Sequence, residues 1–293
     1  MLRGLIYSII SAFAFASMAI LVKLGYSAGL DGNEMMQYRF TYAVLLLGLF
    51  LFFKDRSLLN ISLRDLGKCA FVGLIVYWMQ TTCFVRALAT IPASTAALVL
   101  YVYPVMVTLL SVIFLKLKIN RVTVFALGLV MGGCCLVFYD AFLKSVDMTG
   151  LLYGIGAMLV FSCYLVLVQV LLKGIKPLTA TLYVMGFAAI SFTLSGDPSA
   201  WLNQSWDSIT IGLGLGIFPG VVAVAFLYLA IEEIGSAYAS IFSSVEPVVT
   251  LAAAAVFLNE NVVLLQIGGA ALIILGIIIP NAHVVMIKKR LSG

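Results

Sequence analysis

Charged residues are scarce in this chain of 293 residues. Asp, Glu, Lys and Arg make up only 10% of it, whereas an ordinary soluble domain carries roughly a quarter. Hydrophobic residues account for 63% of the chain, and its mean hydropathy is +1.17. Because a soluble fold of this length could not bury so much apolar surface, the composition excludes an ordinary globular domain and indicates a membrane protein.

Histidine and paired cysteines are also lacking. The single histidine, His283, follows the last apolar run, and the five cysteines show no CxxC spacing. Both facts argue against a metal site, and cysteines within apolar segments are typical of small core residues. No Walker A sequence is present, which argues against ATP-driven pumping. The basic residues are thinly spread without interleaved aromatics, so we expect neither a cofactor nor a nucleic-acid partner.

Ten apolar runs approach the ~20 residues that a helix needs to cross the hydrocarbon core. Each run must be helical, because an unpaired backbone amide in lipid costs several kcal/mol. We therefore predict an all-α membrane protein with ten transmembrane helices. The runs cover residues 4–24, 34–53, 67–88, 94–115, 121–139, 150–172, 177–195, 208–230, 238–258 and 262–281.

Basic residues gather on one side of the predicted membrane. With the N-terminus placed inside, thirteen of the seventeen Lys and Arg residues fall on the cytoplasmic side. The other side receives only Lys23, Arg39, Arg86 and Lys144. This asymmetry follows the positive-inside rule. Because the helix number is even, we expect both termini in the cytoplasm and the protein in the plasma (inner) membrane.

The two halves of the chain repeat one pattern. Residues 4–7 (GLIY) recur as residues 150–153 (GLLY), and residues 87–115 match residues 230–258 without gaps. Each half holds five predicted helices. Since five is odd, the second half must enter the membrane from the opposite side. Two inverted five-helix repeats are an architecture typical of secondary transporters.

The repeat fixes the expected domain boundaries. We predict a first five-helix repeat over residues 1–145 and a second over residues 146–293, which ends in a short basic cytoplasmic tail. The first apolar run mimics a signal peptide, since Arg3 precedes it and it contains the small residues around Phe15. Its counterpart lies in the middle of the chain, where no signal peptidase acts, so we expect residues 4–24 to be retained as a spanning helix.

Several motifs occur along the chain, and the stretch that begins at Ala87 recurs in the second half from Ala230. They are Arg39-Phe40, Ala87-x-x-x-Ile91-x-Ala93-x-x-Ala96 leading to Tyr103-Pro104-Val105, Ala230-x-x-x-Ile234 leading to Glu246-Pro247-Val248, and Leu258-Asn259-Glu260. In this doubled order the sequence resembles the drug/metabolite transporter superfamily, specifically its ten-helix EamA-type branch, over nearly the whole chain. The resemblance implies export of small metabolites without ATP, and similarity to bacterial amino-acid exporters implies an amino acid or related compound.

The sequence departs from this family at one place. Family members often close the fourth helix with an acidic residue, as Glu260 closes the ninth. Here the equivalent stretch is Lys116-Leu117-Lys118. A symmetric acidic pair at these helix ends is therefore not expected.

Glu246 is the most informative single residue. In a helix over 238–258 it lies near the bilayer midplane, where an ionised carboxylate costs ~2.5 kcal/mol or more. We expect it to face protein or water, where it contacts substrate, balances a substrate amino group, or carries a proton. The structural alternative is a hydrogen-bonded carboxyl that braces the helix break at Pro247.

Three prolines mark predicted helix breaks. Pro104 and Pro247 lie at equivalent depths of their helices, and Pro219 lies in the eighth. They are either static bends or hinges that turn freed carbonyls toward a cavity. In the third helix the depth of Pro219 is held by Tyr77 and Trp78, which either form a stacking wall for an apolar substrate or pack against lipid or protein.

We predict a midplane cavity formed by the third, fourth, eighth and ninth helices, with the first and sixth contributing. Its candidate substrate-binding residues are Tyr77, Trp78, Tyr103, Ser243 and Glu246, and its flexible breaks are Pro104, Pro219 and Pro247. Arg39 is expected to extend toward the outer surface. The glycine spacings Gly128-x-x-x-Gly132 and Gly212-x-Gly214-x-Gly216 predict close helix packing.

These features predict a secondary transporter and not an enzyme. It would export a small organic metabolite by rocking one half against the other. Its expected partners are the substrate, the bilayer and protons as a candidate coupling ion, with no obligate protein partner. A passive uniporter or channel is an alternative that flux under a pH gradient would distinguish. A membrane enzyme acting on a lipid-linked substrate is less favoured, because the outer acidic residues are too scattered.

Overall fold

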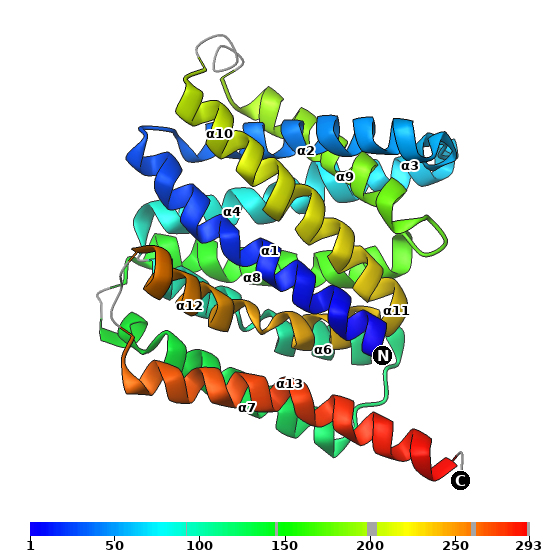
Figure 1. Ribbon diagram of the computed structural model, residues 1–293, viewed down its shortest axis with the longest axis vertical. Coiled ribbons are helices and arrows are strands. Elements are labelled where there is room, and N and C mark those ends of the chain that lie inside the picture. The colour runs from blue at the N-terminus through cyan, green and yellow to red at the C-terminus, as the bar shows by residue number, and fades with distance from the viewer. Residues whose placement is uncertain (92, 144–145, 198–203, 259–261, 292–293) are drawn as a thin grey trace.

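Every regular element in the described part of the chain is helical. The computed structural model (Figure 1) describes residues 1–91, 93–143, 146–197, 204–258 and 262–291. In chain order the elements are α1 (Leu2–Ser27), α2 (Gly32–Lys54), η1 (Arg56–Leu59), α3 (Leu63–Ala70), η2 (Phe71–Tyr77), α4 (Trp78–Thr90), α5 (Ala93–Leu100), α6 (Tyr103–Leu115), α7 (Arg121–Val137), η3 (Tyr139–Leu143), α8 (Met148–Leu171), α9 (Pro177–Ser195), α10 (Trp206–Leu215), η5 (Gly216–Val222), α11 (Ala223–Ser243), α12 (Glu246–Leu258) and α13 (Leu264–Leu291). The prediction of an all-α protein is confirmed.

Among the described residues, seven helical stretches are long and apolar enough to cross a membrane. Two shorter apolar helices, Arg121–Val137 and Leu264–Ile279, accompany them. One of the seven, Trp206–Ser243, contains the non-helical residue Gly235, which divides it into two segments. The exact number of membrane crossings, ten, stays a prediction.

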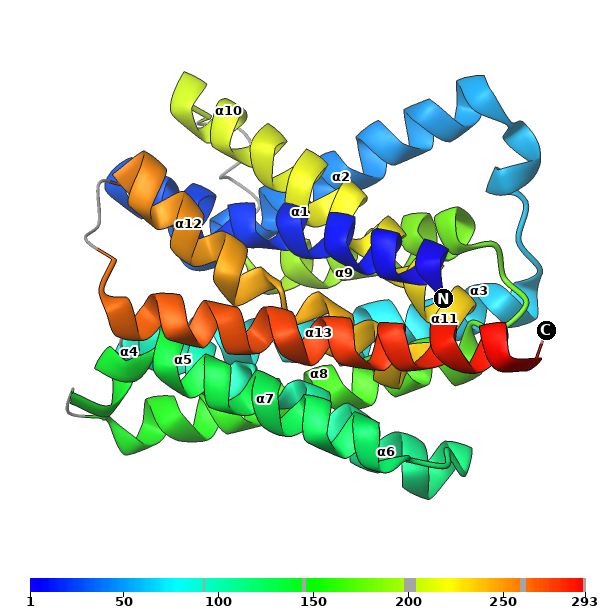
Figure 2. The same ribbon diagram turned by 60° about the horizontal axis from the view of Figure 1, so that its bottom comes forward.

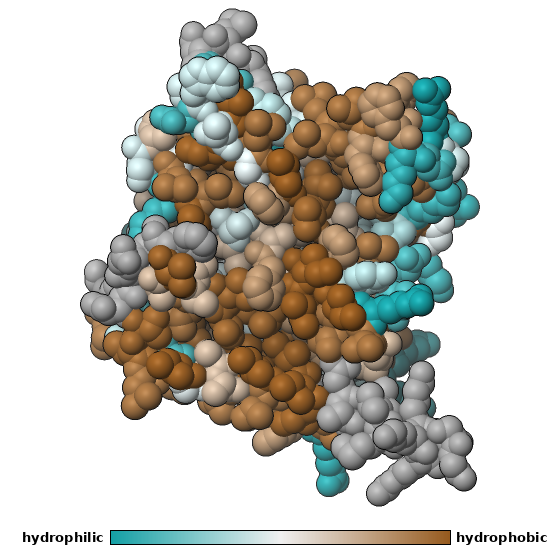
Figure 3. Space-filling model, viewed as in Figure 1, coloured by the Kyte–Doolittle hydropathy of each residue, from teal (hydrophilic) through white to brown (hydrophobic). Residues whose placement is uncertain are grey.

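The flanks of the bundle are apolar. Figure 3 shows a broad hydrophobic surface over the middle of the molecule, with hydrophilic residues gathered toward its edges. The exposed apolar side chains include Phe53 (78% exposed), Phe114 (69%) and Leu194 (81%). A soluble monomer rarely exposes such a large continuous apolar patch, whereas the hydrocarbon of a bilayer accommodates it.

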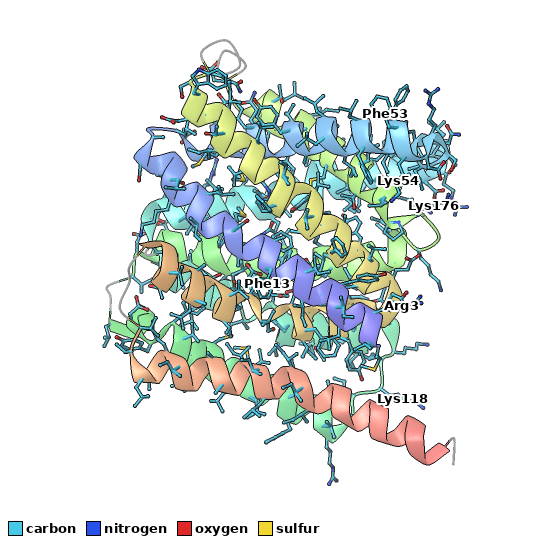
Figure 4. The ribbon with its side chains drawn as sticks, viewed as in Figure 1. Arg3, Phe13, Phe53, Lys54, Lys118 and Lys176 are labelled. Atoms are coloured by element: carbon cyan, nitrogen blue, oxygen red, sulfur yellow. The ribbon has the colours of Figure 1, made fainter. Side chains whose placement is uncertain are left out.

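Basic residues from distant parts of the chain meet at one end of the bundle. Arg3, Lys54, Lys118 and Lys176 all lie at the right-hand edge in Figure 4. The N-terminus and the last turns of α13 lie toward the same edge in Figures 1 and 2. All four belong to the basic set that the sequence predicted on a common side. That this side is cytoplasmic stays a prediction.

The helices pack in matched pairs. Helix α1 packs along α11, and α8 packs along α4. The second long helix, α2, contacts η5 and α9, while α9 in turn contacts η2. Helices α7 and α13 form a separate pair that runs side by side along one flank (Figure 2). In each of these pairs an element from the first half of the chain packs against an element from the second half.

Two membrane helices are broken at corresponding positions. Helix α5 ends at Leu100 and α6 begins at Tyr103, while α11 ends at Ser243 and α12 begins at Glu246. After each break the carbonyl of the preceding valine, Val102 or Val245, accepts hydrogen bonds from two following amides. Tyr103 and Glu246, which begin the helices after the two breaks, are separated by the same number of residues as Ala87 and Ala230. The two breaks are therefore at equivalent positions of the repeat.

The prolines lie at these breaks, where the sequence predicted helix breaks. Pro104 and Pro247 are each the second residue of the helix that follows the break. There the missing amide hydrogen costs little, because the first turn of a helix has no partner for it. Pro104 and Pro247 therefore begin the helices that follow the breaks, and whether the breaks act as hinges stays a prediction.

Two π-helical turns, η2 and η5, occupy the middle of the third and eighth predicted spans. Pro219 lies inside η5, as its predicted role as a helix break requires. The π-turn η2 contains no proline, and no feature of the sequence indicated it. Such π-turns widen the helix and occur often at functional sites.

Glycines provide the close contact between α2 and the α10–η5 segment. A β-carbon added at Gly216 would lie 2.7 Å from the β-carbon of Tyr42, and one at Gly212 would lie 2.8 Å from its ring. This confirms the packing role predicted for the Gly212–Gly216 spacing. The same prediction is wrong for Gly128 and Gly132, which have nothing within 4 Å of an added β-carbon.

Gly235 is expected to be intolerant of substitution. Its φ of 79° and ψ of 162° lie in a region that only glycine adopts without strain. Gly235→Ala should lower the stability of the purified protein by about 1–3 kcal/mol. Thermal unfolding in detergent would measure this. Gly132→Ala, at an open helical position, is the control, and equal melting temperatures for the two variants would contradict the prediction.

Candidate functional site

A cluster of buried aromatic rings lies at the centre of the bundle. The rings of Tyr77 and Tyr164 stack with centroids 4.8 Å apart, and the Tyr164 hydroxyl lies 2.7 Å from that of Tyr228. On the other side of Tyr164, Phe161 stacks at 6.0 Å and also contacts Tyr103 at 4.9 Å. These residues come from η2, α6, α8 and α11, so the tyrosine cluster joins elements from both halves of the chain.

Arg39 adjoins one end of the tyrosine cluster. It does not reach the outer surface as predicted, because it is only 2% exposed. Its Nη2 donates to the Tyr77 hydroxyl at 3.1 Å and to the Pro219 carbonyl at 2.7 Å. The sequence indicated the depth of Arg39 in α2 but not the direction of its side chain around the helix axis. The π-turn η5 provides the carbonyl that Arg39 binds.

A similar contact occurs in the other half of the bundle. Ser191 on α9 donates from its hydroxyl to the carbonyl of Leu74 in η2 at 3.1 Å. Each π-turn thus has one carbonyl bound by a side chain of a helix from the opposite half. In η5 the donor is the cationic Arg39, and in η2 it is the neutral Ser191.

Glu246 lies at the other end of the aromatic cluster. It begins α12 directly after the helix break, and its carboxylate accepts a hydrogen bond from the hydroxyl of Tyr101. The Tyr101 ring lies 6.4 Å from that of Tyr103, which connects Glu246 to the other rings. Acidic residues stabilise the first turn of a helix through its dipole. The start of α12 therefore favours the carboxylate of Glu246, and Tyr101 lies beside it.

The two broken helices contact each other at their breaks. The carbonyl of Ser240, near the end of α11, accepts from the Tyr103 hydroxyl at 3.4 Å and from the Ser244 hydroxyl at 3.1 Å. Farther along α6 and α11, the hydroxyls of Ser111 and Ser236 lie 3.3 Å apart, and the side-chain oxygen of Gln169 accepts from the Ser236 amide. The Tyr103–Ser240 contact joins the two halves near the breaks, and the Ser111–Ser236 contact joins them farther along α6 and α11.

The structure brings together most of the predicted site residues. Tyr77, Tyr103 and Ser243 are buried, and the Ser243 hydroxyl has no hydrogen-bond partner among the described residues. Trp78 is not part of this group. Its ring nitrogen donates to the hydroxyl of Ser195, at the end of α9, at 3.3 Å. Neighbouring positions on a helix point about 100° apart, so Tyr77 and Trp78 could not both face the cluster.

Sequence reasoning missed four residues of the site. Tyr164 and Tyr228 lay within apolar runs that offered no motif, and Arg39 was assigned to the surface. Tyr101 could have been found, since it is the repeat equivalent of Ser244 and lies two residues before Tyr103. Glu260, which the family resemblance placed at the end of the ninth helix, lies outside the described residues.

The tyrosine cluster is closed in this structure. Tyr77 and Tyr103 are each 3% exposed and Tyr164 is 1% exposed. A groove between α1 and η5 is lined by Phe13 and Phe218, but it lies on the apolar flank and does not include the cluster. A molecule could reach these rings only if the surrounding helices separate.

Family comparison identifies this architecture. The model of the EamA-like transporter family matches residues 2–139 and, a second time, residues 148–281. The chain belongs to the EamA-like transporter family. This membership makes it a multi-pass membrane transporter, in agreement with its apolar helices, and is consistent with the absence of enzymatic function.

Curated relatives of this EamA-like chain carry the same general description. An uncharacterized transporter of Archaeoglobus fulgidus is 27% identical over 237 residues, covering 78% of this chain and 83% of the relative. The uncharacterized transporter YcbK of Bacillus subtilis is 25% identical and covers 93% and 92%. One from Clostridium kluyveri is 24% identical and covers 95% and 93%.

The fold of the EamA-like chain has also been observed by crystallography. A solved crystal structure superposes on it with a TM-score of 0.79, covering 99% of both chains at 16% sequence identity. This likeness establishes the fold alone.

Proposed function

We propose that this EamA-like chain is a secondary transporter that exports a small organic metabolite across the plasma membrane. The substrate is an amino acid or a related compound, and transport proceeds by alternating access between two inverted repeats. The observation that carries this proposal is the pair of broken helices, α5–α6 and α11–α12, which meet at the central aromatic cluster. Discontinuous helices that meet near the bilayer midplane are typical of substrate sites in secondary transporters.

The proposed arrangement is ten helices in two repeats of five, residues 1–145 and 146–293. The double match of the family model supports it, as do helix contacts that recur when the halves are exchanged. The first helix of each half packs on the third of the other, as in α1 with α11 and α8 with α4. The second helix of each half contacts the π-turn of the other. Both termini belong in the cytoplasm, because the basic residues in Figure 4 lie at the same edge.

The proposed substrate contacts are Tyr77, Tyr103, Ser243 and Glu246, to which the structure adds Tyr101 and Tyr164. These residues surround the ends of the half-helices, where backbone and hydroxyl groups can exchange their present partners for a ligand. The buried hydroxyl of Ser243 lacks a partner among the described residues, so it could bind a ligand without giving up another contact. Trp78 is a peripheral contact at most, since it is bound to Ser195 on α9.

Protons are the proposed coupling ion, with Glu246 as their carrier. Its carboxylate is the acidic group at the helix breaks, and the repeat places Tyr103 at the equivalent position of the first half. One carboxylate that alternates between a proton and a substrate amino group would exchange the two across the membrane. The partners are therefore the substrate, the proton and the bilayer.

Flux in proteoliposomes tests this function. Purified protein is reconstituted, loaded with a panel of radiolabelled amino acids and related metabolites, and assayed with and without an imposed pH gradient. We expect protein-dependent flux of at least one compound that a proton gradient drives uphill. Flux that only follows the substrate gradient would indicate a uniporter or channel, and no flux of any compound above protein-free liposomes would contradict the proposal.

A further inference from the structure

Arg39 is the most deeply buried cation in the described part of the chain. Groups from four segments surround its guanidinium: Met18 of α1, Met36 and Phe40 of α2, Tyr77 of η2, and Pro219 of η5. An arginine carries its positive charge under all physiological conditions. The bundle therefore holds a permanent cation within its apolar interior.

The nitrogen atoms of the Arg39 guanidinium differ in the hydrogen-bond acceptors that they have. Nη2 has two oxygen acceptors, Tyr77 and Pro219. Nη1 has only the thioether sulfurs of Met18 and Met36, at 3.5 and 3.9 Å, and these are weak acceptors. Nε has no hydrogen-bond partner among the described residues. Most of the guanidinium thus lacks the acceptors that its hydrogen-bonding capacity requires.

Arg39 also lacks a counter-charge in the described part of the chain. Within the described ranges the recorded ion pair is Lys68 with Asp65, near the basic edge of the bundle, and no carboxylate pairs with Arg39. A charged side chain inside a membrane protein is costly and normally pairs with an opposite charge, so an unpaired one marks a functional site. Arg39 is therefore a candidate for binding an anionic ligand.

A purely structural role does not require this charge. Arg39 binds the π-turn carbonyl of Pro219, and in the other half of the bundle Ser191 binds the π-turn carbonyl of Leu74 with a neutral hydroxyl. The repeat equivalent of Pro219 is Val76 and not Leu74, but the Ser191 contact shows that a π-turn carbonyl can be bound without a cation. A neutral donor at position 39 would hold η5 as well, without the cost of burying a charge.

We propose that Arg39 binds the carboxylate of the transported substrate. The donor set left open by Tyr77 and Pro219 suits an anionic oxygen pair, which guanidinium binds through two hydrogen bonds. Tyr77 and Phe40 lie beside the site, with their rings 5.2 Å apart edge to face, so the substrate carries an apolar or aromatic group next to its carboxylate. The inference rests on the proposed transport function and narrows its substrate class to small carboxylates.

Thermal unfolding of the purified, full-length protein in detergent provides a direct binding test. The probes are matched pairs of a carboxylate and its amide: phenylacetate with phenylacetamide, 4-methylpentanoate with its amide, and phenylalanine with phenylalaninamide. We compare the wild type with Arg39→Gln and Arg39→Lys. The control is Arg86→Gln, because Arg86 is exposed and bonds to the Tyr153 hydroxyl at 3.0 Å.

For the wild type and Arg86→Gln, we expect at least one carboxylate to stabilise the protein where its amide does not. Arg39→Gln should weaken that binding by at least about tenfold, and Arg39→Lys, which keeps the charge, should retain part of it. Equal stabilisation by carboxylates and amides in the wild type would overturn the inference, as would no stabilisation by any carboxylate. Unchanged selectivity in Arg39→Gln would do the same.

The binding test and the flux test separate the two proposals. Selective, Arg39-dependent binding without flux in proteoliposomes would support the carboxylate site and reject the transport function. Flux of amides as readily as carboxylates, or flux that Arg39→Gln leaves unchanged, would support transport and reject the carboxylate site.

Discussion

Replacing Glu246 by glutamine is expected to reduce proton-driven flux by at least about tenfold, which corresponds to about 1.4 kcal/mol. Glutamine has nearly the same shape and its amide oxygen can still accept the hydrogen bond from Tyr101. It cannot take up or release a proton, and it carries no charge to balance a substrate amino group. The variant therefore removes the proposed chemistry and keeps the contacts at the start of α12.

The same variant distinguishes the structural role of Glu246 from its transport role. If the carboxylate only braces the break before Pro247, glutamine would keep the brace, and flux and melting temperature would both stay near the wild type. The measurement is uptake into proteoliposomes under an imposed pH gradient, with thermal unfolding in parallel. Glu233→Gln is the matched control, because Glu233 is an exposed carboxylate on α11. Undiminished flux in Glu246→Gln would remove Glu246 from the coupling mechanism.

The direction of each side chain around its helix could not be predicted from the sequence. The order of the apolar runs and the asymmetry of the basic residues indicated helices and depths, because both depend on position along the chain. In a membrane protein the lipid-facing and core-facing sides of a helix are both apolar, so periodicity does not show which side is buried. Arg39 was therefore placed at the surface, and Trp78 was grouped with Tyr77.

Local backbone changes were equally hard to predict. The π-turn in the third span contains no proline, and nothing in Phe71–Tyr77 distinguishes it from an ordinary apolar helix. Close packing against a neighbouring helix fixes such a turn, and that contact comes from residues far along the chain. Gly128 and Gly132 illustrate the same limit, since their spacing is typical of helix packing but their surroundings are open.

Two glycines connect these backbone changes to the symmetry of the site. Gly73 in η2 and Gly216 in η5 are separated by the same number of residues as Ala87 and Ala230. Gly73 packs against Val184 of α9, and Gly216 packs against Tyr42 of α2. Each glycine thus lets a π-turn approach the second helix of the opposite half. The contacts of Arg39 and Ser191 with the π-turn carbonyls depend on this approach.

Gly73→Ala should therefore be among the most destabilising single-methyl additions in the bundle. Its β-carbon would collide with the carbonyl oxygen of Val184 and lie 2.8 Å from the β-carbon of Phe187. Because a backbone carbonyl cannot turn aside as a flexible side chain does, η2 and α9 must move apart. Overpacking of this kind costs about 1–3 kcal/mol. We expect a lower melting temperature in detergent and, since η2 carries Tyr77, reduced flux at the same amount of folded protein.

Gly67→Ala is the matched control for this prediction. Gly67 lies in α3, only six residues earlier along the chain, and has nothing within 4 Å of an added β-carbon. Alanine there should be neutral or stabilising by up to about 1 kcal/mol, because it favours the helix more than glycine does. Equal melting temperatures for the two variants would show that η2 and α9 are not held in this contact. That result would mean that close packing of the π-turns does not position the carbonyls that Arg39 and Ser191 bind.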